Sequence, residues 1–433
     1  MASTIAPFSQ FPRAVRPLPD PLALYLRPGR NDQKPLLEFA ATGDAAFHGV
    51  IFDASIHLFH KELLERTLAQ RQDAVLDPRT QPLATEGGYS AALGRLPWGG
   101  DRPHAPADFL EVAGRRRVGE IAAFALDRGY TQVMAPTHIL SGANDPWLAI
   151  DVDNARHLRD ALDSRNGMGV PLIYPLAIPY AAMRNRDELS AIVTAIQRVP
   201  AASLWLAVEG FGSRRTPTAT LNFLDVAAEL HRLGIPIIAD AVGGLVGLSL
   251  LAFGAVGGLA HGVTFGEHRD TKAWKKPRDK DDSFGLVRRV YLPSIDMRLK
   301  PDQARMLFDA APRAKAAFGC RNPNCCPRGI IDMLENPARH FLFQRTSQIS
   351  ELTRIPPQLR PQRFLDQHVR PATDHALAIA NIKWEKKEMA DAASRHRKRL
   401  DLLRVSLGKR AAAVPPTSFA QLPQTRVARE RMR

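Results

Sequence analysis

The chain has 433 residues, 45% hydrophobic and 24% charged, which is typical of a soluble globular protein with one large domain plus appendages, or two domains. Its three cysteines exclude a disulfide framework, and the first residues (MASTIAPFSQFPRAVRPLPDP) contain no apolar signal segment, so we expect a cytoplasmic protein. The net charge of +15 favours a polyanionic partner.

Residues 241–260 carry no charge and are long enough to imitate a membrane span. The run contains six glycines, however, and Asp240 and His261 flank it. We therefore predict a buried strand-loop-helix unit and no membrane partner.

Short apolar runs alternate with amphipathic helices along most of the chain. The runs predicted as strands are 47–55, 131–139, 170–180, 203–212, 235–244, 259–267, 288–293 and 314–320. Because their apolar character is continuous, they suit a parallel sheet covered on both faces. We predict an α/β protein with a (β/α)₈ barrel of the TIM type; an open doubly wound sheet is the alternative.

Three parts of the chain lie outside the predicted barrel strands and helices: an extension at each end and one long insertion. We expect an N-terminal extension over 1–46, the barrel over 47–355 and a helical, basic C-terminal extension over 356–433. The segment 56–117 reads as an ordered insertion after the first strand, because its Tyr89 and Trp98 favour packing; it would serve as a lid or a partner-binding surface. The charged loop 268–287 is expected to cover the barrel mouth or contact phosphates.

The C-terminal extension concentrates the positive charge. From Lys383 to Arg433 there are fourteen basic residues against five acidic ones. A basic helix over 383–410 predicts binding of DNA or RNA through phosphates, whereas a solvated helix that only keeps the protein soluble is the alternative. A homo-oligomer or an accessory protein is a further candidate partner.

Barrel enzymes carry their chemistry at the C-terminal ends of the strands. Those ends provide the predicted catalytic carboxylates Glu209, Asp240 and Glu267, which would share one mouth and could divide into nucleophile or base and general acid. They could equally hold a cation, or pair with a nearby arginine. The predicted substrate-binding residues are Asp53, His138, Gly243, Gly244, His268 and Arg269. The two glycines would admit a phosphate or a planar base, or would simply allow close helix packing.

All three cysteines lie within the run FGCRNPNCCPRG: Cys320 closes the last predicted strand, and Cys325 and Cys326 lie in the loop that follows it. Cys320, Cys325 and Cys326, with His340 on the following helix, form a complete tetrahedral ligand set for Zn²⁺. Four protein donors leave no position for water, so the site would be structural. The alternative is a reduced thiol cluster with His340 as an ordinary helix residue.

This arrangement, with the stretch IADAVGGLVGLSLLAFGAVGGLAHGVTFGEHR, resembles the tRNA-guanine transglycosylase superfamily and its DNA-modifying relatives. The resemblance implies a barrel with a structural zinc site and base exchange on a nucleic acid, in which a carboxylate attacks C1′ and a deazaguanine replaces guanine. The cysteine spacing differs from the family pattern, and GVTFGEHR lacks the family's nucleophilic aspartate, so Glu267 or Asp240 would take that role.

Two other functions stay open on the sequence alone. A barrel without catalytic activity could serve as a nucleic-acid-binding accessory protein. A flavin- or phosphate-dependent barrel enzyme could act on a small molecule.

Overall fold

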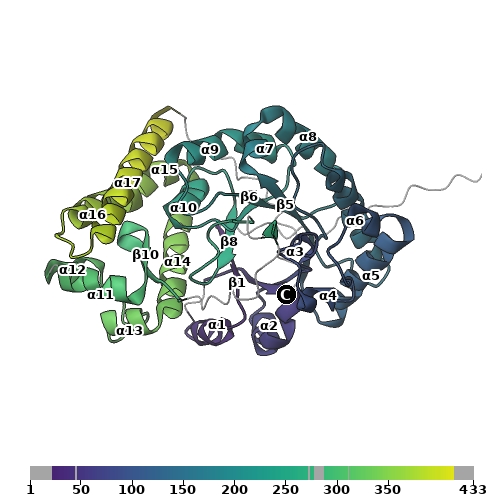
Figure 1. Cartoon of the computed structure of the whole chain (residues 1–433), viewed down its shortest axis with the longest axis horizontal. Coiled ribbons are helices and arrows are strands. Elements are labelled where there is room, and N and C mark those ends of the chain that lie inside the picture. The colour runs from purple at the N-terminus through teal and green to yellow at the C-terminus, as the bar shows by residue number, and fades with distance from the viewer. Residues whose placement is uncertain (1–21, 44–45, 272–273, 277–286, 311, 414–433) are drawn as a thin grey trace, which may run out of the picture.

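The computed structural model describes residues 22–43, 46–271, 274–276, 287–310 and 312–413. In this part of the chain, eight parallel strands form a closed barrel in sequence order, and the last strand pairs with the first (Figure 1). The predicted fold class is confirmed. Parts of the predicted N-terminal extension, of the loop 268–287 and of the basic tail lie outside the described residues.

The barrel strands are short and buried on both faces. They are β1 (Ala23–Arg27), β2 (Gly49–Asp53), β3 (Asp73–Asp77), β4 (Gln132–Met134), β5 (Leu172–Pro179), β6 (Ser203–Glu209), β7 (Ile237–Asp240) and β8 (Gly258–Gly262). One set of side chains fills the inside of the barrel, including Tyr25, Val75, Trp205 and Ile238. The alternate set belongs to the main core between strands and helices.

Two of the barrel strands were missed by the sequence prediction. β1 lies within the expected N-terminal extension, and β3 lies within the expected insertion 56–117. Length does not explain the omission, because the predicted β2 and β8 also have five residues. β3 has only three consecutive apolar residues between two aspartates, and the apolar run of β1 was assigned to the N-terminal extension. The barrel therefore begins at Ala23 rather than at residue 47.

Two of the predicted strands are not part of the barrel. The run 288–293 contains β9 (Val290–Leu292), which pairs antiparallel with β10 (Met297–Leu299) in a separate two-stranded sheet. The run 314–320 is mostly helix α12 (Pro312–Phe318). Its alanines and lysine are good helix formers and its proline suits a helix start, so local propensity, not the apolar pattern, decides its structure.

Helices surround the barrel and continue beyond it. Those between the strands are α1 (Gln33–Ala40), α2 (Lys61–Ala69), α3 (Thr80–Leu83), α4 (Ala91–Gly94), α5 (Glu111–Asp127), α6 (Pro146–Asp163), α7 (Tyr180–Arg184), α8 (Arg186–Ile196), α9 (Pro217–His231) and α10 (Gly244–Ala252). Those after β8 are α11 (Pro301–Ala310), α12, α13 (Ile330–Glu335), α14 (Pro337–Thr353), α15 (Arg360–Phe364), α16 (Arg370–Ala380) and α17 (Lys387–Ala413). α14 packs against α1, β1 and α10 and so takes the place of the eighth barrel helix.

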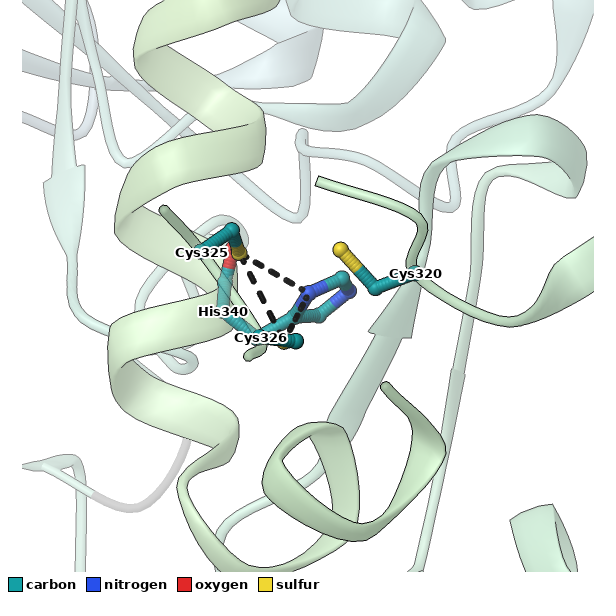
Figure 2. Close-up of side chains that lie close together, drawn as sticks. All are labelled: Cys320, Cys325, Cys326 and His340. Carbon is teal, nitrogen blue, oxygen red and sulfur yellow. Dashed lines mark hydrogen bonds between the residues drawn. The ribbon is translucent and has the colours of Figure 1, made fainter. Parts of the chain in front are cut away.

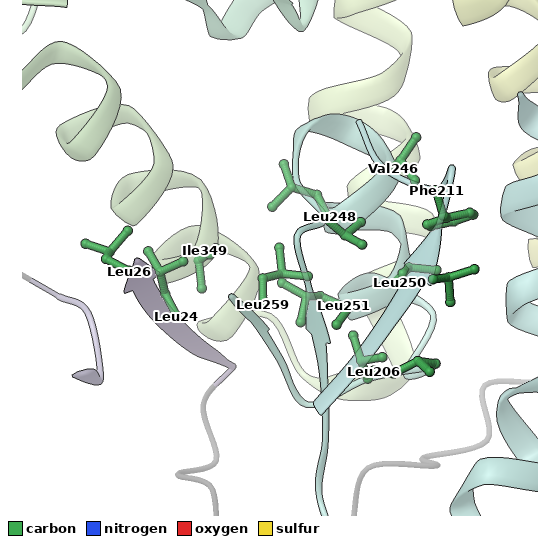
Figure 3. Packing of buried hydrophobic residues seen from close by; sticks show 14 of the residues in the cluster. Leu24, Leu26, Leu206, Phe211, Val246, Leu248, Leu250, Leu251, Leu259 and Ile349 are labelled. Carbon is green, nitrogen blue, oxygen red and sulfur yellow. The ribbon is translucent and has the colours of Figure 1, made fainter. Parts of the chain in front are cut away.

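The uncharged run 241–260 is the predicted buried unit. It contains α10 and most of β8, and all nine residues of α10 are buried. Leu248 and Leu251 of this helix lie in one cluster with Leu206 of β6 and Leu259 of β8 (Figure 3). Among the described residues, no helix is both long and apolar enough to cross a membrane.

The segment 56–117 is ordered, as its aromatic residues predict. Trp98 is fully buried and its Nε1 donates a 2.8 Å hydrogen bond to the carbonyl of Pro78, directly after β3. Tyr89 Oη donates to the carbonyl of Gly100 at 2.8 Å. The segment is therefore packed onto the C-terminal end of the barrel.

Closure of the barrel depends on a close approach at Gly258, where β8 passes β1. A Cβ atom at this position would lie 2.5 Å from Ile238 Cδ1 and 2.8 Å from the Cβ of Ala23. We expect Gly258→Ala to lower the free energy of unfolding by about 1–3 kcal/mol, because the strands must separate to admit the methyl group. Urea unfolding at equilibrium measures this change. Gly169→Ala is the control, since a Cβ there meets nothing within 4 Å; equal stability of the two variants would contradict the prediction.

Candidate active site and metal centre

The inside of the barrel ends in a layer of charged side chains. Side chains of a strand alternate between its two faces, so the residue two positions after an inward residue also points inward. Counting on from the inward Tyr25, Ile51, Val75 and Ile238 reaches the charged residues Arg27, Asp53, Asp77 and Asp240. Four strands therefore place three carboxylates and one guanidinium at the C-terminal mouth.

Arg27 joins two carboxylates across this mouth. Its Nη2 lies 3.1 Å from Asp240 Oδ2, and its Nη1 donates a hydrogen bond to Asp77. Burial alone would lower the pKa of Arg27, but the attraction of Asp240 and Asp77 outweighs burial and raises it. Arg27 therefore stays charged and holds together side chains from β1, β3 and β7.

Arg79, directly after β3, adds a second cation to the mouth. Its Nε lies 2.9 Å from Asp53 Oδ2, and its backbone N–H donates to Asp77 Oδ1 at 2.8 Å. The backbone of Arg79 has φ +61°, the left-handed region that costs a non-glycine residue energy. This strain is maintained next to the charged layer, where strained residues often position functional groups.

A third cation, Arg269, comes from the loop after β8 and has no carboxylate partner within ion-pair distance among the described residues. Its Nη2 donates to Gln81 Oε1, and its guanidinium lies 5.0 Å from the ring centroid of Trp274. Burial lowers the pKa of Arg269 to about 10. Repulsion from Arg27 and Arg79 also lowers this pKa, and the attraction of Asp240 does not make up for the two effects. This half-buried guanidinium has no direct carboxylate partner among the described residues and can bind an anion.

The loop that carries Arg269 is fastened over the mouth. Backbone hydrogen bonds join it to the end of β6, from Gly210 N to Arg269 O and from Arg269 N to Phe211 O. Trp274 lies over both Arg79 and Arg269, and its carbonyl accepts from Gly87 N in the segment after β3. The two long loops therefore meet above the charged layer and enclose a small polar pocket whose lining includes Thr137 and Asp240.

Several predicted site residues belong to this mouth. Asp240 and Arg269 line the pocket, and Asp53 pairs with Arg79 at its side. Glu209 lies at the rim, 3.5 Å from Lys275 Nζ. Their catalytic and substrate-binding roles stay predictions.

Glu267 was predicted to share the mouth with Asp240, and this placement is wrong. Glu267 is 2% exposed and Oε1 accepts a 2.8 Å hydrogen bond from Arg345 of α14, while Arg298 pairs with the other oxygen. Burial alone would raise the pKa of Glu267, but Arg298 and Arg345 outweigh it and lower the pKa to about 2. Of the three loop residues Glu267, His268 and Arg269, only Arg269 lines the pocket. The loop after β8 does not continue the alternation of side chains between the two faces of the strand.

His138 also lies away from the pocket. It is 1% exposed, its Nδ1 donates to Asp151 Oδ1 at 2.6 Å, and its ring stacks on Trp147 with the centroids 3.5 Å apart. The residue before it, Thr137, faces the pocket instead. His138 therefore packs α6 against the barrel and does not line this pocket, in contrast to the predicted position at the mouth; its substrate-binding role stays a prediction.

Gly243, Gly244 and His268 surround the Glu267 group rather than the mouth. A Cβ at Gly243 would lie 2.1 Å from the Glu267 carboxyl carbon, and a Cβ at Gly244, where φ is +63°, would lie 2.7 Å from Asp296 Oδ1. The glycines thus permit close packing, the second of their two predicted roles. His268 is exposed beside them.

Arg27, Asp77 and Arg79 were missed by the sequence prediction. They could not be found because β1 and β3 were not recognised as strands. The alternation was nevertheless present: Ala23, Tyr25 and Arg27 form one inward set in β1, matching the set that ends at Asp53 in β2.

The three cysteines and His340 converge, as predicted, at the start of α14 (Figure 2). The sulfur atoms of Cys325 and Cys326 are 3.6 Å apart, and each lies 3.5 Å from His340 Nδ1. All four ligand atoms, including Cys320 Sγ, lie within 4.8 Å of one another. Cys320 follows α12 and does not close a barrel strand, which corrects the expected position of the cluster.

A tight turn explains how two adjacent cysteines reach the same point. Asn322 Oδ1 accepts hydrogen bonds from the backbone N–H groups of Asn324 and Cys325, and its carbonyl accepts from Cys326. This asparagine turn reverses the chain directly before the pair of cysteines. Pro337 then begins α14 and places His340 in its first turn.

Outer contacts prepare the four side chains for a metal ion. His340 Nε2 donates a 2.9 Å hydrogen bond to the carbonyl of Tyr291, which leaves Nδ1 as the free ligand nitrogen. Gln344 Nε2 lies 3.7 Å from Cys320 Sγ and 3.8 Å from Cys325 Sγ, so it can donate to both sulfurs. These contacts orient the donors and lower the charge on the thiolates.

The spacing of Cys325, Cys326 and His340 matches three corners of a tetrahedron, and Cys320 lies within 4.8 Å of them. Metal–sulfur bonds of about 2.3 Å and metal–nitrogen bonds of about 2.0 Å place sulfur atoms about 3.8 Å apart and sulfur about 3.5 Å from nitrogen. Without a cation, the hydrogen bonds with Cys320 and Cys325 raise the pKa of the Cys326 thiol. A metal ion would let all three thiols ionise, and the cluster can hold one.

No family model matches the chain, and no curated protein is similar to it. The solved structures similar to it include the type I 3-dehydroquinate dehydratase of Clostridium difficile, with 12% identity, a TM-score of 0.35 and coverage of 58% of this chain and 88% of that chain. The corresponding enzyme of Enterococcus faecalis has 13% identity and a TM-score of 0.35 over 57% of this chain and 92% of that chain. A dihydrodipicolinate synthase has 11% identity and a TM-score of 0.30 over 88% and 99%. Similarity at this level carries no information about the reaction.

The Glu267 group predicts a large effect on stability. We expect Glu267→Gln to lower the free energy of unfolding at pH 7 by about 3–5 kcal/mol, because the buried Arg345 loses its balancing charge. In the wild type this stabilisation is complete above the ordinary glutamate pKa of 4.5 and is lost as the pH falls toward about 2. Urea unfolding at pH 7 and pH 3 should therefore show the difference between wild type and variant shrinking in acid. Glu38→Gln, at an exposed residue, is the control; an unchanged midpoint for Glu267→Gln would contradict the assignment.

The donor set predicts one bound metal ion per chain. We expect elemental analysis of the purified protein to find this ion, and Cys326→Ser to lose it because a hydroxyl is a poor substitute for a thiolate. Asn324→Ser is the matched control in the same turn, since its side chain is exposed and should leave the metal in place. A wild-type protein that takes up neither zinc nor cobalt after reduction would contradict the prediction.

Proposed function

We propose that this protein is an enzyme whose reaction centre is the mouth of the barrel, where Asp240 is the reacting carboxylate and Arg269 binds an anionic part of the substrate. The observation that carries the proposal is the enclosed layer of opposite charges at the C-terminal strand ends, which is where barrels place their chemistry. A purely structural mouth does not require a half-buried arginine that lacks a direct carboxylate partner.

Asp240 has the surroundings of a nucleophile or a general base. It ends β7, lines the pocket and has its charge balanced by Arg27 at 3.1 Å. Asp77, on the other nitrogen of the same guanidinium, is a second carboxylate within reach of the same substrate. Burial would raise the pKa of Asp77, but Arg27 and Arg79 outweigh burial and lower it, so Asp77 is ionised and could accept a proton while Asp240 attacks.

Arg269 supplies the recognition of charge. Its guanidinium is desolvated and lies near two other arginines, so an arriving phosphate or carboxylate would relieve repulsion rather than compete with an existing ion pair. Trp274 holds the plane of the guanidinium by stacking. The substrate class is therefore an anion.

The more specific form of the proposal is base exchange on a nucleic acid. The sequence resemblance to the transglycosylases and the basic helix α17 support it. Asp240 would attack C1′ of a nucleotide as the glycosidic bond breaks, and the departing base would take the electron pair of that bond and a proton from solvent. An incoming base would then form its bond to C1′, displace the carboxylate and lose its proton to solvent. Glu267 has no part in this reaction, because it is buried against Arg345.

We further propose zinc as the metal of the cysteine cluster. Three thiolates and one imidazole favour zinc, and four protein donors leave no position for a reacting water. The ion would fasten the turn before α13 to the start of α14 and would take no part in the reaction.

Base exchange is tested by incubating the protein with radiolabelled guanine and either transfer RNA or genomic DNA. We expect the wild type to incorporate label into one of these, and Asp240→Asn to lower the rate by about a thousandfold or more, because the amide cannot attack C1′. Asp187→Asn is the control, since this aspartate is exposed on α8, outside the mouth. Incorporation at the wild-type rate by Asp240→Asn would exclude Asp240 as the reacting group, and a wild type that labels neither nucleic acid would exclude guanine exchange.

A further inference from the structure

One uncharged side chain of the mouth, Gln81, lies between the groups that the proposed function uses. It is half-buried, lies shortly after β3 and lines the same pocket as Asp240. Its Oε1 accepts a hydrogen bond from Arg269 Nη2, and its Nε2 lies 3.5 Å from Thr137 Oγ1. Gln81 therefore connects the loop after β8 with the segment that follows β4.

The contacts of Gln81 fix the orientation of its amide. Arg269 carries donors and no acceptor, so the atom that faces it is the carbonyl oxygen of the amide. Thr137 Oγ1 donates its hydrogen to the carbonyl of Pro175 at 2.6 Å, and so it offers the NH₂ group of Gln81 a lone pair. Thr80 Oγ1 donates to the carbonyl of Thr137 at 2.8 Å and keeps this anchor in place. Both neighbours of the amide therefore require the same orientation.

The amide also sets Arg269 apart from the other two arginines of the pocket. Arg27 and Arg79 each contact a carboxylate, at 3.1 and 2.9 Å. Arg269 contacts the oxygen of Gln81 instead, which holds the guanidinium but carries no net charge. Its Nε is buried and has no acceptor among the described residues. The positive charge of Arg269 and one of its donors therefore stay available to a ligand.

We propose that Gln81 is the positioning residue through which the pocket selects an anion, because its amide fixes the guanidinium of Arg269 without neutralising it. A glutamate of the same shape would occupy Arg269 in an ion pair, as Asp240 occupies Arg27. The inference rests on the proposed role of Arg269 as the anion site. It adds the residue that decides the charge of the ligand, whichever reaction follows.

Binding of small anions to the full-length protein tests this role without turnover. Isothermal titration with inorganic phosphate and with acetate measures the affinity for two classes of anion. For the probe that binds more tightly, we expect Gln81→Glu to weaken binding by about thirtyfold, because the anion loses a charge-assisted hydrogen bond to an internal carboxylate. Gln81→Met has a similar length but no polar atoms. It should weaken binding by about threefold, since Arg269 keeps its charge and loses its support.

The order of the two variants separates an effect of charge from an effect on the fold. If Gln81 only supported the fold, Gln81→Glu would bind the anion better than Gln81→Met, because it keeps the contact with Arg269. The proposal predicts the reverse order. Gln197→Glu is the matched control, since it adds the same charge at an exposed residue after α8, at the opposite end of the barrel from the mouth. It should bind within about twofold of the wild type, and circular dichroism verifies that each variant is folded.

Arg269→Gln separates this inference from the proposed function. If Arg269→Gln loses binding while Gln81→Glu binds as the wild type does, the anion site stands and the role of Gln81 is overturned. Equal or weaker binding by Gln81→Met than by Gln81→Glu would overturn it as well. A wild type that binds neither probe, or an Arg269→Gln variant that binds normally, would refute the anion site and the inference together. Weaker binding by Gln81→Glu than by Gln81→Met, with binding lost in Arg269→Gln, supports both.

Discussion

The contact of Arg27 with Asp77 and Asp240 is the interaction on which the mouth of this barrel depends. It exists only because β8 pairs with β1 and closes the sheet, which brings a side chain of β1 between those of β3 and β7. The attraction to both carboxylates outweighs the cost of burying the guanidinium. Arg27 thus occupies both carboxylates, and Arg269 is left with Gln81 as its hydrogen-bond partner, which is why we propose that it receives an anion.

A second charged group, formed by Glu267 and Arg345, holds the loop that carries Arg269. Glu267 and Arg345 join the loop after β8 to α14, and Arg345 also donates to Gln348, which contacts Tyr291 Oη. The carbonyl of Tyr291 accepts from His340, a member of the metal-binding cluster. Metal centre and mouth loop are therefore connected through α14 by hydrogen bonds. An ion at the cluster would orient α14, and α14 holds the loop that carries Arg269.

How much of this could be predicted from the sequence differs between fold and site. The continuous apolar runs identified six barrel strands and the barrel class, because burial on both faces leaves a direct mark on composition. β3 has only three apolar residues between two aspartates, and the apolar run of β1 was assigned to the N-terminal extension. Because these two strands were not recognised, Arg27, Asp77 and Arg79 were missing from the predicted site. The cysteine cluster was found complete, since four soft donors close together in the sequence have few other uses.

The sequence by itself determined the residue types: acids at the strand ends, glycines before α10, a donor set for a metal and an excess of arginine. Tertiary structure alone decided which of these groups meet. Asp240 and Glu267 end neighbouring segments with the same charge, yet one lines the pocket and the other is buried against Arg345. The reason is geometric. A strand fixes the direction of its side chains through its alternation, but the loop beyond it does not, and the direction taken by a loop residue depends on partners that lie far away in the chain.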